Sequence, residues 1–236
     1  MPGMALQEDI GAIALGDLRV TDETVDRLAK LLRRCSYFLA FLSFATFARW
    51  IKVPRSDLPI YNVASEGNAW TWFNVTVIAL AATAMLLTAL ARRSAGLPAL
   101  GWFMTAAVLY LLSLDDLAGI HERFGALGEA LGGGAGFLHF AWVIPGFLAA
   151  AAVIGVFWTA FRDAAPPVRR AFLLGIGLFF FGALVLEMIG GAVYEASGHR
   201  RPYAYVYHLE EILEAVGMIF VLSAGLKDLI RVSATA

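Results

Sequence analysis

The chain has 236 residues, of which 60% are hydrophobic and only 16% are charged, and its formal net charge is −1. Soluble domains carry about a quarter charged residues, so this composition favours an integral membrane protein. A single cysteine excludes an internal disulfide framework. Nucleic acid is not an expected partner, because basic and aromatic residues do not gather beyond the N-terminal segment.

Residues 1–34 are predicted to be a cytoplasmic N-terminal segment that ends in a short amphipathic helix, from Thr21 to Arg34. Val25, Leu28 and Leu32 share one face of that helix, and four basic residues supply its cationic surface. Such a helix is expected to lie on an anionic inner leaflet. The lipid bilayer, and anionic lipid at this basic helix, are therefore the expected partners.

Residues 35–230 are predicted to form one all-α domain, a polytopic membrane helix bundle with six transmembrane helices. Crossing the hydrocarbon takes about 20 helical residues. Stretches of this kind occupy residues 35–52, 70–91, 97–118, 138–161, 171–193 and 204–225. None alternates as a barrel strand would, and several begin or end near a tryptophan, as at the boundaries of a bilayer.

The distribution of Lys and Arg predicts the orientation of these helices. With the N-terminus inside, 12 of the 18 Lys and Arg residues fall on cytoplasmic segments. The excess of positive charge on the inner side predicts that both termini are cytoplasmic. The expected location is the bacterial inner (plasma) membrane, crossed several times.

With this orientation, residues that are energetically unfavourable in contact with lipid are expected at one membrane depth, near the outer, periplasmic leaflet. They stand in "SLDDLAGIHER" at the end of the third span, in "LEMIGGAVYE" at the end of the fifth, and in "YHLEEILEAVGM" at the start of the sixth. Ionised carboxylates are unfavourable against lipid, so they are expected to face the bundle interior or a water-filled cavity. The sequence therefore predicts one shared polar pocket built from distant segments.

Several carboxylates with histidines favour a divalent metal ion, with Zn, Fe, Mn and Mg all open. The predicted metal ligands are Asp115, Glu122, Glu187, His208 and Glu211. The predicted catalytic or proton-carrying residues around them are Asp116, His121, Glu210 and Glu214. A bound ion would activate water, which favours metal-dependent hydrolysis or modification of a lipid or another membrane-associated substrate.

Three alternatives remain open at this stage. The first is an ion- or proton-coupled transporter, in which the same acids and histidines change protonation. The second is a haem protein, because His121, His139 and His208 are all expected at the outer level. In the third, the polar residues are interfacial or are paired with Arg123, Arg200 and Arg201.

The pairing of "SLDD…IHER" with "HLEEILEAVGM" resembles a group of bacterial inner-membrane proteins with no assigned activity. That resemblance covers mostly residues 70–225 and implies bacterial origin and membrane location. The chain is also faintly similar to membrane-embedded metal hydrolases of the ceramidase type, which place acids and histidines on several helices. The spaced histidine pattern of those enzymes is absent here.

Overall fold

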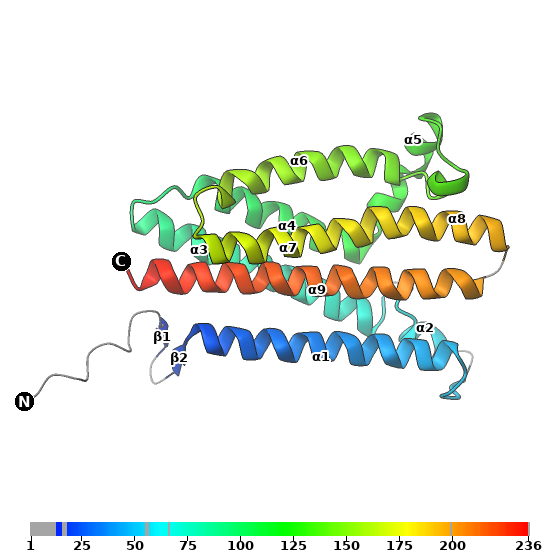
Figure 1. Cartoon of the computed structure of the whole chain (residues 1–236), viewed down its shortest axis with the longest axis horizontal. Coiled ribbons are helices and arrows are strands. Elements are labelled where there is room, and N and C mark those ends of the chain that lie inside the picture. The colour runs from blue at the N-terminus through cyan, green and yellow to red at the C-terminus, as the bar shows by residue number, and fades with distance from the viewer. Residues whose placement is uncertain (1–12, 16–17, 55–56, 66, 199, 236) are drawn as a thin grey trace, which may run out of the picture.

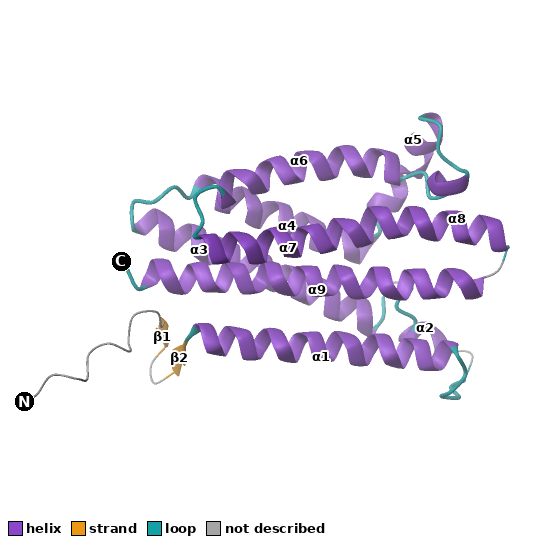
Figure 2. Ribbon diagram, in the orientation of Figure 1, coloured by secondary structure: helices purple, strands orange, loops and turns teal. Residues whose placement is uncertain are grey.

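The computed structural model describes residues 13–15, 18–54, 57–65, 67–198 and 200–235. A short antiparallel hairpin of β1 (Ile13–Leu15) and β2 (Leu18–Val20) precedes a bundle of helices, as Figure 2 shows. The long helices are α1 (Asp22–Phe47), α3 (Ala69–Ser94), α4 (Leu100–Ala118), α6 (Val143–Phe161), α7 (Pro166–Phe180), α8 (Glu187–Ser197) and α9 (Arg200–Ser233). Between them lie α2 (Leu58–Tyr61), η2 (His121–Phe124), α5 (Gly125–Ala130), η3 (Gly136–Leu138) and the π-helical η4 (Phe181–Leu186). The helical bundle confirms the predicted all-α class.

Four helices of the described chain are long and apolar enough to cross a membrane. They are α3, α4, α6 and the continuous helix Pro166–Ser197, which contains α7, η4 and α8. The four correspond to the second to fifth predicted spans, and they give the chain the character of a membrane protein. The first and sixth predicted spans lie in α1 and α9, which are not among the four. These two helices carry more charge, because α1 begins with acidic and basic residues and α9 contains three glutamates close together.

Helix α1 corrects the prediction of a separate amphipathic helix over Thr21–Arg34, because that segment and the first predicted span form one continuous helix. Thr21 caps the helix, and the Thr21 and Thr24 side chains satisfy each other's backbone N–H groups. Val25 is buried, and an ion pair of 2.7 Å joins Asp26 to Lys227 of α9. Val25, Ala29 and the partly buried Leu32 of this segment therefore pack on the bundle, whereas Leu28 is exposed.

Helix α9 is the central element of the fold. It packs against α1, α3, α7 and α8, and Figure 1 shows it running between α1 and the α7–α8 helix. Consecutive long helices alternate in direction along the bundle (Figure 1). Gly175 of α7 and Gly217 of α9 permit close approach, since a Cβ on either would stand about 2.6 Å or less from the other's carbonyl oxygen. Side chains on the inner faces of α9 therefore lie inside the protein.

The helix ends near the polar pocket are fixed by local sequence signals. The Asn68 side chain accepts hydrogen bonds from the backbone N–H groups of Trp70 and Thr71, at 2.8 Å and 3.0 Å, and starts α3. Gly119 ends α4 in the left-handed conformation, with φ of 54°. These two caps place the first turn of α3 and the last turn of α4 at the same end of the bundle as the start of α9.

Candidate functional site: an acidic cluster in the helix bundle

Acidic side chains from four elements come together at the end of the bundle where α4 ends and α9 begins. Glu214 interacts electrostatically with Glu211, Asp116, Glu187 and Asp115. Glu187 in turn interacts with Glu122, and Glu210 with Glu187, Glu211 and Glu214. We call this set the acidic cluster; it consists of Asp115, Asp116, Glu122, Glu187, Glu210, Glu211 and Glu214. Each predicted acidic site residue thus interacts electrostatically with at least one other, and Glu122 does so from the exposed edge.

Three neutral side chains donate hydrogen bonds to the acidic cluster. The Trp70 indole Nε1 donates to Glu211 Oε2 at 2.6 Å, and the Trp142 Nε1 donates to Glu187 Oε1 at 3.2 Å. The Asn74 amide donates to both carboxylate oxygens of Asp116, at 3.2 Å and 3.3 Å. Such donors hold each carboxylate in one orientation while leaving its negative charge unneutralised.

These donors were missed by sequence reasoning. Trp70 and Trp142 have the sequence features of tryptophans at a membrane boundary, and Asn74 lies inside an apolar stretch. The available signal was position along the predicted spans, since all three fall at the same level as the acids. A polar residue or an indole N–H at that depth needs a partner, and the carboxylates are the partners available.

The charge of the acidic cluster is poorly compensated within the described chain. Glu187, Glu210, Glu211 and Glu214 form no ion pair there with Lys or Arg. Glu187 and Glu210 interact electrostatically with each other inside the bundle, as two carboxyl groups of the same charge type. Two buried acceptors, Glu210 Oε2 and Asn74 Oδ1, have no hydrogen-bond partner among the residues that the structure describes. Buried oxygens in this state attract protons or a cation.

His121 is the nearest basic group, and it lies in η2 just beyond the end of α4. The backbone N–H of His121 donates a hydrogen bond to Asp115 Oδ1 at 2.7 Å, and the His121 ring Nδ1 pairs with Asp115 Oδ2 at 3.0 Å. Burial lowers the pKa of His121, but the hydrogen bond and negative charge of Asp115, with Glu122 and Glu187, outweigh it and raise the pKa above its ordinary value. The imidazole also lies against the Trp142 ring, 4.5 Å between centroids. His121 therefore joins Asp115 to the Glu187 side of the cluster.

The backbone beside Glu187 has an unusual form. The six residues of η4, Phe181–Leu186, are π-helical and lead directly into Glu187. A π-helical turn changes which side chains face a neighbour, and such turns are frequent at functional sites. Gly182 in this turn lies against α9, where a Cβ would stand 2.8 Å from Glu214 Cγ and 3.0 Å from the Glu210 carbonyl oxygen. The absence of a side chain at position 182 therefore makes room for Glu214.

Two predicted ligands are placed differently from the rest. His208 is buried on the side of α9 that faces α1, with Nε2 2.9 Å from Ser43 Oγ and Nδ1 2.7 Å from the Ala204 carbonyl oxygen. Because that carbonyl can only accept, Nδ1 donates to it and Nε2 accepts from the Ser43 hydroxyl. Glu122 is exposed on η2 at the edge of the cluster. His208 thus has a structural role in joining α1 to α9, apart from the acidic cluster.

The other histidine at this level, His139, follows η3 and pairs at 3.4 Å with Glu195 of α8. Its ring also packs against Tyr194. As the side chains stand, the described residues contain no group of three or more His, Cys, Asp and Glu placed to hold a metal ion. Coordination by the acidic cluster would therefore need its carboxylates to turn toward a common point.

Comparison with known proteins places the chain in a family without assigning it an activity. Residues 34–227 match the family model described as a domain of unknown function, DUF8692. The match covers most of the chain, so the chain belongs to that family. No curated protein and no solved structure matches it.

Proposed function

We propose that the acidic cluster binds a divalent metal ion, and that this ion serves hydrolysis or modification of a lipid or another membrane-associated substrate. One observation carries the proposal: Glu187, Glu210, Glu211 and Glu214 gather inside the bundle without a Lys or Arg partner among the described residues. A bound cation would replace the protons that such a cluster otherwise needs. Oxygen-rich sites of this kind suit Mg or Mn, and Zn or Fe when a histidine joins.

The ligands that we propose are Asp116, Glu187, Glu211 and Glu214, chosen because they interact electrostatically inside the bundle. Asp116 and Glu211 interact electrostatically with each other, and Glu214 interacts with all three of the others. Trp70, Trp142 and Asn74 would orient these ligands from outside, and Glu210 would hold the proton that the cluster exchanges. A divalent ion lowers the pKa of bound water, so His121 or a spare carboxylate could take up the proton of an attacking water.

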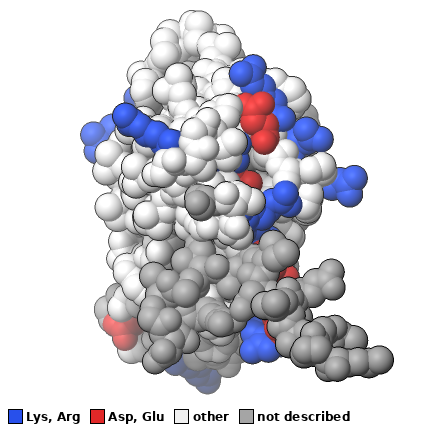
Figure 3. All heavy atoms as spheres, turned by 90° about the vertical axis from the view of Figure 1, so that its left-hand side faces the viewer, with Lys and Arg blue, Asp and Glu red and all other residues white. Residues whose placement is uncertain are grey.

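We also propose that α1 and α9 cross the membrane with the four apolar helices, which gives six crossings and cytoplasmic termini in a bacterial inner membrane. The central position of α9 allows a helix with polar residues to cross, because the partners of those residues lie on neighbouring helices and not in the lipid. Figure 3 views the end of the bundle where α1 begins and α9 ends, and Lys and Arg are more prominent there than Asp and Glu. Positive charge at that end favours the cytoplasmic side.

Metal content of the purified chain tests the proposed function. After extraction in detergent and dialysis, elemental analysis should find about one divalent ion per chain. Chelation should remove the ion, and Mn²⁺ should rebind with affinity that Glu211→Gln or Glu214→Gln weakens about tenfold or more. Glu129→Gln, on the exposed surface of α5, is the matched control and should bind Mn²⁺ normally. His208→Gln should also retain the metal.

Two results would overturn the proposal. One is a folded chain that neither contains nor takes up Mn²⁺, Mg²⁺, Zn²⁺ or Fe²⁺. The other is metal-independent, proton-driven flux in proteoliposomes that disappears in Asp115→Asn, which would identify a transporter instead.

A further inference from the structure

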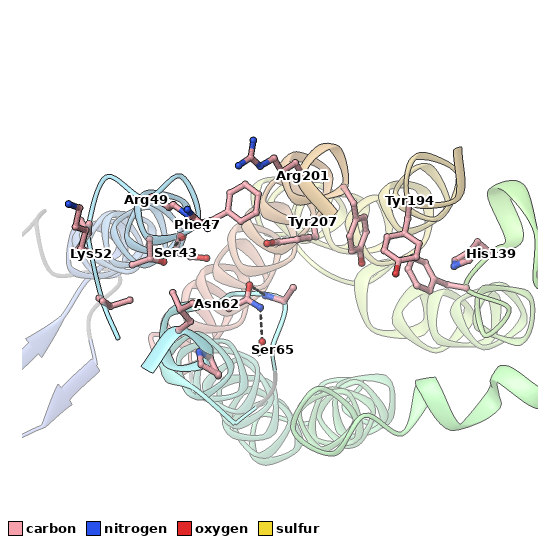
Figure 4. A pocket seen from close by; sticks show the side chains of 18 residues that line it. Ser43, Phe47, Arg49, Lys52, Asn62, Ser65, His139, Tyr194, Arg201 and Tyr207 are labelled. Carbon is pink, nitrogen blue, oxygen red and sulfur yellow. Dashed lines mark hydrogen bonds between the residues drawn. The ribbon is translucent and has the colours of Figure 1, made fainter. Parts of the chain in front are cut away.

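A large cavity opens beside the acidic cluster at the same end of the bundle. Its volume is about 1270 Å³, and it lies between the end of α1, the loop around α2 and the start of α9. Figure 4 shows Arg49 and Lys52 on its α1 side, with Arg201 and Tyr207 from α9 and His139 at the far side. Sites for small ligands usually measure about 300–1,000 Å³, so this cavity accommodates a ligand of lipid size.

The charged residues that line the cavity are all positive. Arg49, Lys52 and Arg201 are exposed at its rim, and the lining contains no Asp or Glu among the described residues. None of these three cations forms an ion pair with an acid of the described chain. Arg49 is also held with φ of 61°, a conformation that a residue with a side chain rarely adopts. A rim of this kind selects an anionic group.

Aromatic side chains form one part of the cavity lining, namely Phe47, Phe140, Tyr194, Tyr203 and Tyr207. Aliphatic residues such as Ile51, Val53 and Leu58 and polar residues such as Asn62 and Ser65 form the rest. A small hydrated anion would gain little from such walls. A molecule with an anionic head and an apolar body matches both the rim and the interior.

Tyr203 separates this cavity from the acidic cluster. Its ring lies against α8 at Gly190, where a Cβ would stand 2.8 Å from Tyr203 Cε2. Its phenol interacts electrostatically with Glu187, Glu210 and Glu211, while the same side chain lines the cavity. A ligand in the cavity would therefore contact a side chain that interacts electrostatically with these carboxylates.

We infer that this cavity binds an amphiphile with a phosphate-bearing, negatively charged head group, placed at the rim formed by Arg49, Lys52 and Arg201. Arg49 and Lys52 follow the end of α1, and Arg201 lies in the first turn of α9. If these helices cross the membrane as proposed, the rim lies at the level of the lipid head groups. The inference of a binding site depends only on the cavity and the residues that line it. Its role as the substrate site of the acidic cluster rests on the proposed function.

Native mass spectrometry of the detergent-purified, chelator-treated chain tests the inference with three probes. Dihexanoyl phosphatidic acid should bind at least about tenfold more tightly than inorganic phosphate, and more tightly than uncharged dihexanoyl glycerol. Arg49→Gln and Arg201→Gln should each weaken phosphatidic acid binding about tenfold. Arg93→Gln, at an exposed position in the last turn of α3 at the other end of the bundle, is the control and should not change phosphatidic acid binding.

The outcomes separate the two proposals. Glu211→Gln should bind phosphatidic acid as the wild type does, even where it no longer binds Mn²⁺. If inorganic phosphate binds as tightly as dihexanoyl phosphatidic acid, the ligand is a soluble anion, and the inference of an amphiphilic ligand is overturned. Binding of phosphatidic acid that is indifferent to both rim substitutions would overturn the site itself, whatever the metal analysis shows.

Discussion

At the scale of single residues, the acidic cluster depends as much on a missing side chain as on the carboxylates. Gly182 occupies the π-helical turn against α9, and Glu214 fills the space that a side chain would take. Glu214, like Glu211, interacts with acids on both α4 and α8. A shift of Glu214 would therefore change how the carboxylates of three helices lie relative to one another.

Gly182→Ala should destabilise the protein by about 1–3 kcal/mol, because the new methyl group overlaps Glu214 and approaches the α9 backbone. The same change should weaken Mn²⁺ binding, since Glu214 must move. Thermal unfolding in detergent and Mn²⁺ titration measure the two effects. Gly177→Ala, on an exposed face of α7 with open space at its Cβ, is the control. A stable Gly182→Ala with normal unfolding would contradict this account of the turn.

The acids could be predicted from the sequence because hydrocarbon restricts where ionised groups lie, whatever the details of packing. His208 could not be placed in the same way. The polar residues of α9 cover a wide arc of the helix, and an arc of that width faces more than one neighbour. His208 stands at its edge and meets Ser43 of α1, whereas Glu211 meets Trp70 of α3. Periodicity gives the face of a helix but not which helix lies opposite it.

At the scale of elements, the opposite end of α9 is joined to α3 by a buried ion pair. Arg92 and Asp228 stand 2.7 Å apart, with side chains 6% and 4% exposed. Arg92 also donates to the Pro98 carbonyl oxygen at 3.1 Å, and its guanidinium lies 5.0 Å from the centre of a Trp102 ring. The sequence indicated only that Arg92 flanks a span, because the partner lies 136 positions away. Helix α9 is thus tied to its neighbours by polar contacts at both ends.

Asp228→Asn should lower the free energy of unfolding by about 3–5 kcal/mol, because it leaves the Arg92 charge buried without a counterion. The Arg162–Asp163 pair is the matched comparison, since its side chains are 63% and 37% exposed at 3.7 Å. Asp163→Asn should change stability by about 0.5 kcal/mol or less. Chemical unfolding in detergent compares the two variants. Equal effects would mean that burial does not determine the contribution of the Arg92–Asp228 pair.

At the scale of the whole molecule, the acidic cluster and the cavity share one end, and the buried Arg92–Asp228 pair lies toward the other. The apolar length between the ends is provided by α3, α4, α6 and the Pro166–Ser197 helix. Helices α1 and α9 run beside them along the bundle (Figure 1). A bilayer around those four helices would therefore also surround much of α1, whose outer face exposes Tyr37, Phe38 and Phe41. Because the ends of all these helices lie at one end of the bundle or the other, one experiment on the accessibility of those ends can measure both the number of crossings and their direction.

Cysteine labelling answers that question, because the chain has one cysteine, Cys35, which can be replaced by serine. In that background, Lys52→Cys, Leu131→Cys and Arg201→Cys should react with a membrane-impermeant maleimide in spheroplasts with intact inner membranes. Asp22→Cys, Arg93→Cys and Ser233→Cys should react only after permeabilisation, since they lie at the other ends of α1, α3 and α9. Labelling of positions 22 and 52 from the same side would remove α1 from the membrane, and positions 201 and 233 give the same test of α9. A fully reversed pattern would keep the six crossings but place the acidic cluster at the cytoplasmic leaflet, against the orientation that the distribution of Lys and Arg favours.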